Sequence, residues 1–278
     1  MSIGNKVRVA IETECSAIKA GNVHPKAPFR DMNHQSFVHA ATEIGKAVDH
    51  FIGQSVGTVA LNSVKAMMNA VGTNTSLGTI LLFAPLIVSE HRAQSGSFSV
   101  PKFRCELKET LASLTPEDSK DIYEAIQIAK PGGLGDSTSM DVRGAAPSNI
   151  LEAMRLASKW DDIALQYVTS FDLVFLIAER LETKTTVGLS LFDAIRCLQV
   201  ELLAERIDSL IARKQGMEFA NRVRQQAKHV VAVGPFGCDA YEAAWHRFDS
   251  SLRDEEHRGN PGTIADLIAA ALFVCCRS

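Results

Sequence analysis

Three short runs along the chain combine asparagine with glycine or proline, and their residue types suit the binding of a charged ligand. They are 21–25 (GNVHP), 72–78 (GTNTSLG) and 260–266 (NPGTIAD). Each precedes an apolar stretch of helical character, where exposed backbone N–H groups and the positive end of the helix dipole favour phosphate or carboxylate. One shared polyanion site is therefore a hypothesis, with these candidate binding residues: Gly21, Asn22, His24, Thr73, Asn74, Thr75, Gly78, Asn260 and Thr263.

Both later runs also have a purely structural interpretation. Thr73, Asn74 and Thr75 offer side-chain oxygens that can cap a buried helix without any ligand. Asp266 lies three positions after Thr263, as in a capping box, so it can cap its own helix. Alternatively, Asp266 can hold a magnesium ion that bridges substrate phosphates, because magnesium usually takes only one or two protein carboxylates.

Further acids stand in segments without helical periodicity. Asp31 follows the first run, and Asp136 and Asp141 lie in the glycine-rich segment 132–141, whose Gly135 is a further candidate for substrate or phosphate binding. Acids in loops are usually just solvated, but the 17-residue connection 131–147 is longer than most helix connections, which favours a lid or ligand loop. Its glycines do not form the strand-turn-helix fingerprint of dinucleotide-binding proteins.

Several classes of function lack support in the sequence. The histidines show no HExxH spacing, no serine sits in a GxSxG elbow, and the six scattered cysteines form no CxxC pair. The net charge of −3 and the lack of a dense basic run argue against nucleic acid or anionic membrane as a partner. Scattered cysteines fit a reducing cytoplasm, and residues 1–20 lack the apolar centre of a secretory signal.

The apolar periodicity predicts helices nearly throughout. Expected helices include 37–51 capped by Asp31 or Asn33, 116–129 capped by Thr115, one capped by Ser148, a longer pattern over 163–178, and 191–212, 217–232, 239–248 and 263–275. The segment 79–88 has no polar face and should lie centrally, and both it and 267–276 are shorter than the roughly 20 residues that span a membrane. Irregular segments are expected at 22–30, 95–102, 131–147, 234–238 and 258–262.

These elements predict an all-α fold of roughly ten or more helices, because helices with apolar stripes must bury them against one another. No segment has the composition of a flexible linker, so residues 1–278 are expected to form one compact domain. The sequence leaves open whether the chain is a monomer or a homo-oligomer.

Taken in order, the motifs resemble those of the triphosphoribosyl-dephospho-CoA synthase family. The matching segments are Glu14-Cys15-Ser16 before Gly21-Asn22-Val23, Asp31-Met32 with Phe37, Thr73-Asn74-Thr75 with Gly78, Gly132-Gly133-Leu134-Gly135 with Asp141-Val142, and Asn260-Pro261-Gly262-Thr263 with Ala265-Asp266-Leu267. The resemblance implies an all-helical enzyme that uses ATP and dephospho-CoA, releases adenine, and makes the precursor of a phosphoribosyl-dephospho-CoA prosthetic group.

This reaction would need acidic side chains and helix N-termini. Displacing adenine from the anomeric carbon builds oxocarbenium-like charge, and the triphosphate must be neutralised. Under this resemblance Asp31 or Asp141 would deprotonate the attacking ribose hydroxyl or bind Mg²⁺, Asp266 would be a further Mg²⁺ ligand, and Asn74, Thr75 and the N–H groups after them would hold phosphate.

Two departures from the family pattern leave the substrate open. Ser76-Leu77 stands where members usually have a basic residue or histidine, and Lys19-Ala20-Gly21-Asn22 replaces the usual Lys-Pro-Gly. One alternative is therefore a relative that uses another phosphorylated donor or acceptor in the biosynthesis of one-carbon-carrier cofactors. Another is a noncatalytic helical protein that binds a nucleotide or a partner without releasing adenine.

Overall fold

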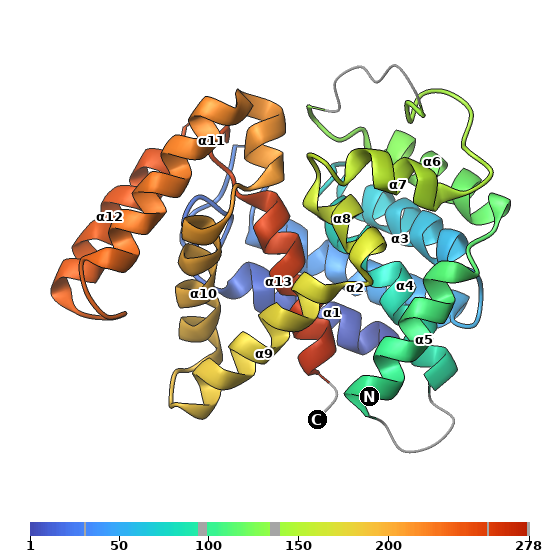
Figure 1. Ribbon diagram of the computed structural model, residues 1–278, viewed down its shortest axis with the longest axis horizontal. Coiled ribbons are helices and arrows are strands. Elements are labelled where there is room, and N and C mark those ends of the chain that lie inside the picture. Colours follow the sequence, from blue (N-terminus) through green and yellow to red (C-terminus); the bar gives the residue numbers. More distant parts are fainter. Residues whose placement is uncertain (31, 94–98, 134–139, 255, 277–278) are drawn as a thin grey trace.

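The computed structural model describes the chain except residues 31, 94–98, 134–139, 255 and 277–278. The described residues form α-helices and no β-strand, which confirms the predicted all-α class (Figure 1). The helices are α1 (Ile3–Ser16), α2 (His34–Phe51), α3 (Val56–Val71), α4 (Leu77–Ala93), α5 (Val100–Ala112), α6 (Pro116–Ala129), α7 (Ile150–Ala157), α8 (Asp162–Thr169), α9 (Asp172–Thr186), α10 (Leu191–Glu205), α11 (Ser209–Ala232), α12 (Asp239–Leu252) and α13 (Gly262–Cys275).

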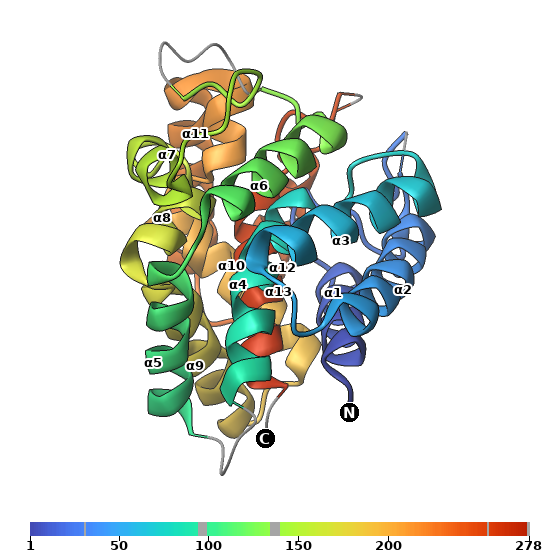
Figure 2. The same ribbon diagram turned by 90° about the vertical axis from the view of Figure 1, so that its right-hand side faces the viewer.

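The two most apolar helices, α4 and α13, lie side by side at the centre of the molecule (Figure 2). Nearly every residue of each is buried, and the rings of Phe83 and Phe273 have their centroids 5.3 Å apart. A helix that is apolar all round must be covered on all sides. The expectation that segment 79–88 lies centrally is therefore confirmed.

The remaining helices surround this pair. Helices α1, α2 and α3 pack successively on one another and α6 packs on α3, whereas α9 and α10 cover the other side of α13 (Figure 2). Helices α11 and α12 form an antiparallel pair that extends beyond α10 (Figure 1). Buried apolar residues from all of these helices belong to one continuous core. None of the described helices is long and apolar enough to cross a membrane.

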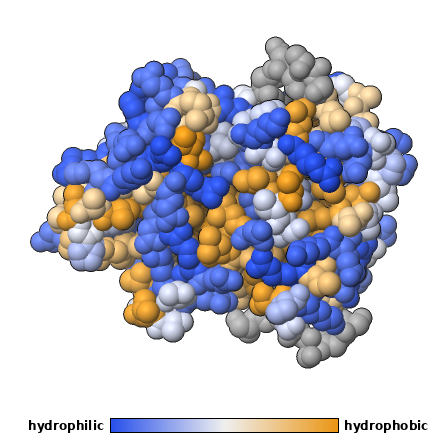
Figure 3. Space-filling model, viewed as in Figure 1, coloured by the Kyte–Doolittle hydropathy of each residue, from blue (hydrophilic) through white to orange (hydrophobic). Residues whose placement is uncertain are grey.

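Hydropathy follows this arrangement at the surface. On the face shown in Figure 3, hydrophilic residues cover the outward side of α11, and hydrophobic residues reach the surface in the middle of the molecule, between the outer helices.

A proline inside the central helix α4 is accommodated by a tyrosine from α8. Pro85 has no N–H group, so the Leu81 carbonyl one turn earlier cannot receive its usual helical hydrogen bond. The buried hydroxyl of Tyr167 donates to this carbonyl at 2.7 Å. Burial raises the pKa of the Tyr167 hydroxyl above its ordinary value, so it stays a donor at neutral pH.

Several N-caps predicted from the sequence are confirmed. Asn33 caps α2 and Thr115 caps α6, each with a reciprocal capping box, and Pro116 occupies the first turn of α6. Of the two caps considered for α2, Asn33 is the one observed, and Asp31 lies outside the described residues.

Other boundaries differ from the expectations. Asn149 rather than Ser148 caps α7, because its side chain accepts from the Leu151 N–H at 3.0 Å. The pattern over 163–178 breaks between α8 and α9, where Ser170 and Phe171 both adopt left-handed backbone conformations. The expected helix 191–212 ends at Glu205, because Asp208 caps a new helix there. Helix α5 starts inside the segment expected to be irregular, since its Pro101 is tolerated in a first turn.

We predict that Tyr167→Phe lowers the free energy of unfolding by about 1–3 kcal/mol, because it leaves the buried Leu81 carbonyl without a partner. The matched background is Pro85→Ala, in which the restored N–H can bond to Leu81. The cost of Tyr167→Phe should shrink markedly in that background, as measured by urea denaturation in a double-mutant cycle. Equal costs in both backgrounds would show that the hydroxyl does not compensate for the proline.

Candidate active site

One cavity of about 490 Å³ receives residues from all three asparagine runs. The first run contributes Asn22, the middle run contributes residues 73–78, and the last run contributes Asn260, Thr263 and Asp266. These segments are far apart in the sequence, so the structure brings together the residues on which the hypothesis of one shared site depends.

The N-termini of four helices line this cavity. They belong to α4 (Leu77, Gly78, Thr79), α8 (Asp161, Ile163, Ala164), α11 (Leu210) and α13 (Gly262, Thr263). The positive ends of four helix dipoles therefore meet at one place, which favours an anionic ligand.

Two of these helices cap each other. Asp208, the N-cap of α11, accepts from the Ile211 N–H of its own helix at 3.0 Å and from the Ile264 N–H of α13 at 2.8 Å. In return, the Thr263 hydroxyl oxygen in α13 accepts from the Leu210 N–H of α11 at 3.1 Å. The expectation that Thr263 caps its own helix is thus wrong: Pro261 holds the cap position of α13, and Thr263 serves α11.

Asp266 in α13 likewise serves a neighbouring helix. Its Oδ1 accepts from the Thr79 hydroxyl of α4 at 2.5 Å, and the backbone N–H of Thr79 also bonds to this carboxylate. A Cβ on Gly78 would lie 2.1 Å from Asp266 Oδ2, so only glycine permits this approach. The capping-box interpretation of Asp266 is therefore wrong for α13, because the carboxylate caps α4 instead.

The middle run is itself a helix cap. Asn74 Oδ1 accepts from the Leu77 N–H at 3.0 Å, and the Ser76 hydroxyl donates to Thr75 at 3.2 Å. The N–H groups of Leu77 and Thr79 therefore already have partners in the protein. A phosphate here would meet the helix dipole and the side chains of Thr73, Asn74 and Thr75 on the cavity wall.

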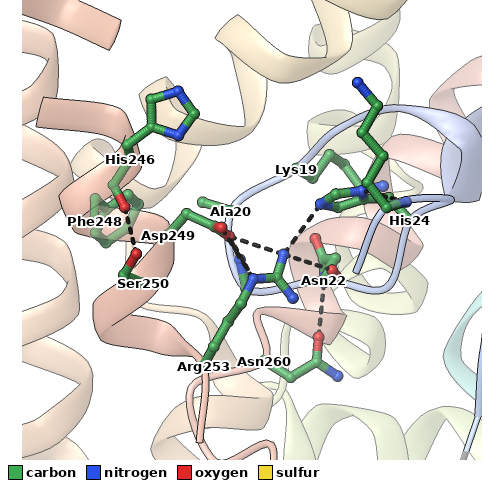
Figure 4. Close-up of polar contacts among 12 residues, drawn as sticks. Lys19, Ala20, Asn22, His24, His246, Phe248, Asp249, Ser250, Arg253 and Asn260 are labelled. Carbon is green, nitrogen blue, oxygen red and sulfur yellow. Dashed lines mark hydrogen bonds and ion pairs between the residues drawn. The ribbon is translucent and has the colours of Figure 1, made fainter. Parts of the chain in front are cut away.

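A buried polar network fixes the first run against the last (Figure 4). Asn22 donates from Nδ2 to Asn260 Oδ1 at 2.7 Å and accepts at Oδ1 from Gln199 at 2.9 Å. Arg253 donates to the Asn22 carbonyl at 3.1 Å and pairs with Asp249 at 2.9 Å. Asn22 and Asn260 thus face the cavity in fixed orientations.

Gly21 and His24 do not line the cavity but lie within this network. Gly21 has φ +72°, and a Cβ there would meet Leu252 at 2.9 Å. His24 Nε2 lies 3.2 Å from Arg253, and burial together with the Arg253 charge lowers the pKa of His24 to about 4. His24 is therefore neutral at pH 7 and can accept from Arg253 (Figure 4). Both residues shape the loop that presents Asn22.

Three carboxylates line the cavity: Asp161, the cap of α8, together with Glu14 and Asp266. Glu14, at the end of α1, is 7% exposed, and Lys19 Nζ lies 3.0 Å from its Oε1 without the alignment of a hydrogen bond. Lys19 is wholly buried and donates to the Glu14 backbone carbonyl at 2.5 Å. Burial raises the pKa of the Glu14 carboxyl, and burial with the nearby charges of Glu14 and Asp208 raises the pKa of Asp266 to about 7.

The other predicted acids are placed differently. Asp141 does not line the cavity; it binds Arg143 through both carboxylate oxygens, at 2.8 and 2.7 Å, and accepts from the Arg143 N–H at 2.9 Å. Asp31, Asp136 and Gly135 lie outside the described residues. Among the described residues, no group of three or more His, Cys, Asp or Glu could hold a metal ion by itself.

Comparison with known proteins supports the resemblance seen in the motifs. The profile of a family described as ATP:dephospho-CoA triphosphoribosyl transferase matches residues 1–277. The chain therefore belongs to this family.

A solved structure shows the same fold. It is a crystal structure from Archaeoglobus fulgidus, named "putative triphosphoribosyl-dephospho-coA synthase", with a TM-score of 0.66 and 24% sequence identity. The similarity covers 86% of this chain and 97% of the other. A search of curated proteins gave no match.

Membership confirms the expected class of enzyme, a transferase that moves the triphosphoribosyl group of ATP. ATP and dephospho-CoA, which the family description names, are both polyanions. Four helix N-termini suit ligands of this kind.

Sequence reasoning missed several residues of the cavity wall. Glu14 was noted only as part of a family motif, because its position near the end of an amphipathic helix gives no sign of its cavity. Three cations, Lys130, Arg213 and Lys214, also line the cavity. Lys130 borders the glycine-rich segment, which could have drawn attention to it, whereas Arg213 and Lys214 follow an ordinary helix start.

We predict that Asp266 makes stability fall as pH rises. Its pKa of about 7 exceeds its ordinary value of 3.8, so the folded state binds more protons than the unfolded chain between these values. The contribution is complete below pH 4 and is lost as the pH approaches 7, with a slope of at most about 1.4 kcal/mol per pH unit.

Asp266→Asn keeps an oxygen acceptor for Thr79 but cannot titrate. Urea denaturation of both proteins in EDTA, from pH 5 to 8, should show the variant gaining stability relative to the native chain as pH increases. Parallel stability curves would contradict the raised pKa.

Proposed function

We propose that this cavity binds ATP and 3′-dephospho-CoA and transfers the triphosphoribosyl group to a ribose hydroxyl of the acceptor. The bond between the anomeric carbon and adenine breaks and a bond to the acceptor oxygen forms; the hydroxyl proton passes to a general base, and the departing adenine takes up a proton. The observation that carries the proposal is the meeting of four helix N-termini with the acids Glu14 and Asp266 on one cavity wall. The first feature suits polyphosphate, and the second suits proton transfer and an oxocarbenium-like carbon.

Glu14 is our choice for the general base. It lines the cavity, and its raised pKa makes the carboxylate a stronger base once it is ionised. The nearby ammonium of Lys19 favours that ionised form. Asp31 and Asp141 stay predictions for the same role or for metal binding.

The donor set at Asp266 fits a magnesium ion. Asp266 lines the cavity; its Oδ1 accepts from Thr79, while its Oδ2 packs closely against Gly78. Magnesium needs only one or two protein carboxylates when substrate phosphates and water complete its shell. Bound there, the ion would neutralise phosphate charge and keep Asp266 ionised despite its burial.

The uncharged polar residues would orient the substrates. Asn22 and Asn260 are held by their mutual hydrogen bond, and Thr73, Asn74 and Thr75 line the start of α4. Their amide and hydroxyl groups offer donors to sugar or phosphate oxygens without adding charge. Thr263 also lines the cavity, but its hydroxyl oxygen already accepts a hydrogen bond from the Leu210 N–H of α11.

The identity of the acceptor substrate depends on the residues that follow Asn74 and Thr75. Ser76 is buried and donates to Thr75, so this position offers no cation where family members usually have one. This favours, as a second candidate, a related phosphorylated acceptor from the biosynthesis of a one-carbon-carrier cofactor. We place either reaction in the cytoplasm, where the thiols of Cys15, Cys105, Cys197 and Cys238 would stay reduced.

The direct test is to incubate the purified protein with ATP, MgCl₂ and 3′-dephospho-CoA. Adenine and the triphosphoribosyl adduct should appear together in mass spectra. Adenine release with other acceptors but not with dephospho-CoA would favour the second candidate. Nucleotide binding without any adenine release would contradict a transferase of either kind.

We predict that Glu14→Gln lowers kcat by roughly 10²- to 10⁴-fold, the usual contribution of a general base. The matched control is Glu12→Gln in the same helix, because Glu12 pairs with Arg8 and does not line the cavity. Asp31→Asn and Asp141→Asn belong in the same series. A kcat that survives Glu14→Gln but falls with either of them would move the base to that residue.

A further inference from the structure

Three cations line the cavity, and two of them are exposed to solvent. These two are Lys130 and Lys214, whereas Glu14 and Asn22 of the same cavity are buried. A Cβ on Gly132 would lie 3.4 Å from Lys214 Cε, and one on Gly133 would lie 3.3 Å from Arg213 Cγ. The turn that follows α6 therefore packs against the first turns of α11.

The backbone conformation at this end is unusual for lysine. Lys130 ends α6 with φ +45°, in the left-handed region that glycine or asparagine normally occupies. Gly133 follows at φ +75°, and its missing side chain lets the turn pack against Arg213 and Lys214. Lys130 therefore has a strained backbone conformation, and such strain is common at ligand sites.

Arg213 is held by an ion pair at the cavity wall. Its Nη1 pairs with Asp161, the N-cap of α8, at 2.6 Å. Its buried Nε–H has no hydrogen-bond acceptor among the described residues.

The helix ends cannot neutralise a triphosphate on their own. Asp161, Asp208 and Asp266 each accept from first-turn N–H groups around the cavity, so their negative charges offset the dipoles. Within the described part of the lining, positive side-chain charge comes from Lys130, Arg213 and Lys214. A nucleoside triphosphate needs such cations to offset its charge.

We infer that Lys130, Arg213 and Lys214 form the subsite for the outer phosphates of the donor triphosphate. The donor then lies with its β- and γ-phosphates toward the exposed lysines and its anomeric carbon deeper, near Glu14. This orientation deepens the proposed function, since it takes the donor to be a nucleoside triphosphate. It keeps the buried Glu14 carboxylate away from the most highly charged part of the substrate.

The inference is tested by binding, independently of turnover. Isothermal titration calorimetry with inorganic tripolyphosphate compares the native protein with Lys130→Gln/Lys214→Gln. We expect the double variant to bind tripolyphosphate roughly 10- to 100-fold more weakly, as the loss of charged hydrogen bonds implies, and to bind adenosine unchanged. Lys214→Arg should retain most of the affinity.

The matched control is Lys108→Gln, an exposed lysine of α5 outside the cavity, which should change neither affinity. Unaltered tripolyphosphate binding in the double variant, or no tripolyphosphate binding by the native protein, would overturn the subsite. An equal loss of adenosine affinity would do so too, because it would indicate a general disturbance of the cavity.

Failure of the proposed function gives a different result. A native protein that binds tripolyphosphate through these lysines but releases no adenine would retain the subsite and lose the transferase reaction. Conversely, a transferase whose KM for ATP is the same with and without the two lysines would lose the subsite alone.

Discussion

The exchange of caps between helices is the interaction on which the rest of the site depends. Helix N-termini leave N–H groups without partners, and at α4, α11 and α13 those partners come from one another: Asp266 serves α4, Asp208 serves α13, and Thr263 serves α11. Displacing α11 or α13 from this arrangement would leave donors unsatisfied on more than one helix at once. The caps therefore fix the cavity wall and the fold by the same bonds.

This arrangement also sets the electrostatics of the cavity. Carboxylates that satisfy helix ends are brought close together in a buried place, so the pKa values of Asp208 and Asp266 rise to about 6 and about 7. Carboxyls with raised pKa values can exchange protons near neutral pH or gain their charge from a bound cation. The same placement therefore makes Asp208 and Asp266 cap the helices and raises the pKa values of their carboxyls.

The sequence was informative where the physics is local. Periodicity and caps such as Thr115 predicted the helical class, because a helix face and its first turn involve neighbouring residues. The middle and last asparagine runs correctly indicated helix starts that share a cavity, whereas the first run lies in the connection between α1 and α2. The sequence did not reveal which helix each residue serves: Thr263 and Asp266 have the spacing of a local capping box, yet both bond to other helices. The packing of α13 against α4 and α11 decides this, and no local pattern encodes it.

The same limit explains the residues that were missed. Glu14 and Lys214 occupy ordinary positions in amphipathic helices, and only tertiary packing brings them to one cavity, where Glu14 is buried and Lys214 is exposed. Their separation has a physical reason. A carboxylate beside a polyphosphate would be repelled by it, whereas a carboxylate beside the anomeric carbon would meet the positive charge that develops as adenine leaves. A donor held by its outer phosphates in the exposed lysines could therefore bring its ribose to the buried acids without placing like charges together. Excluding water from the buried part of the cavity would strengthen the attraction between the carboxylate and the positive charge on the anomeric carbon.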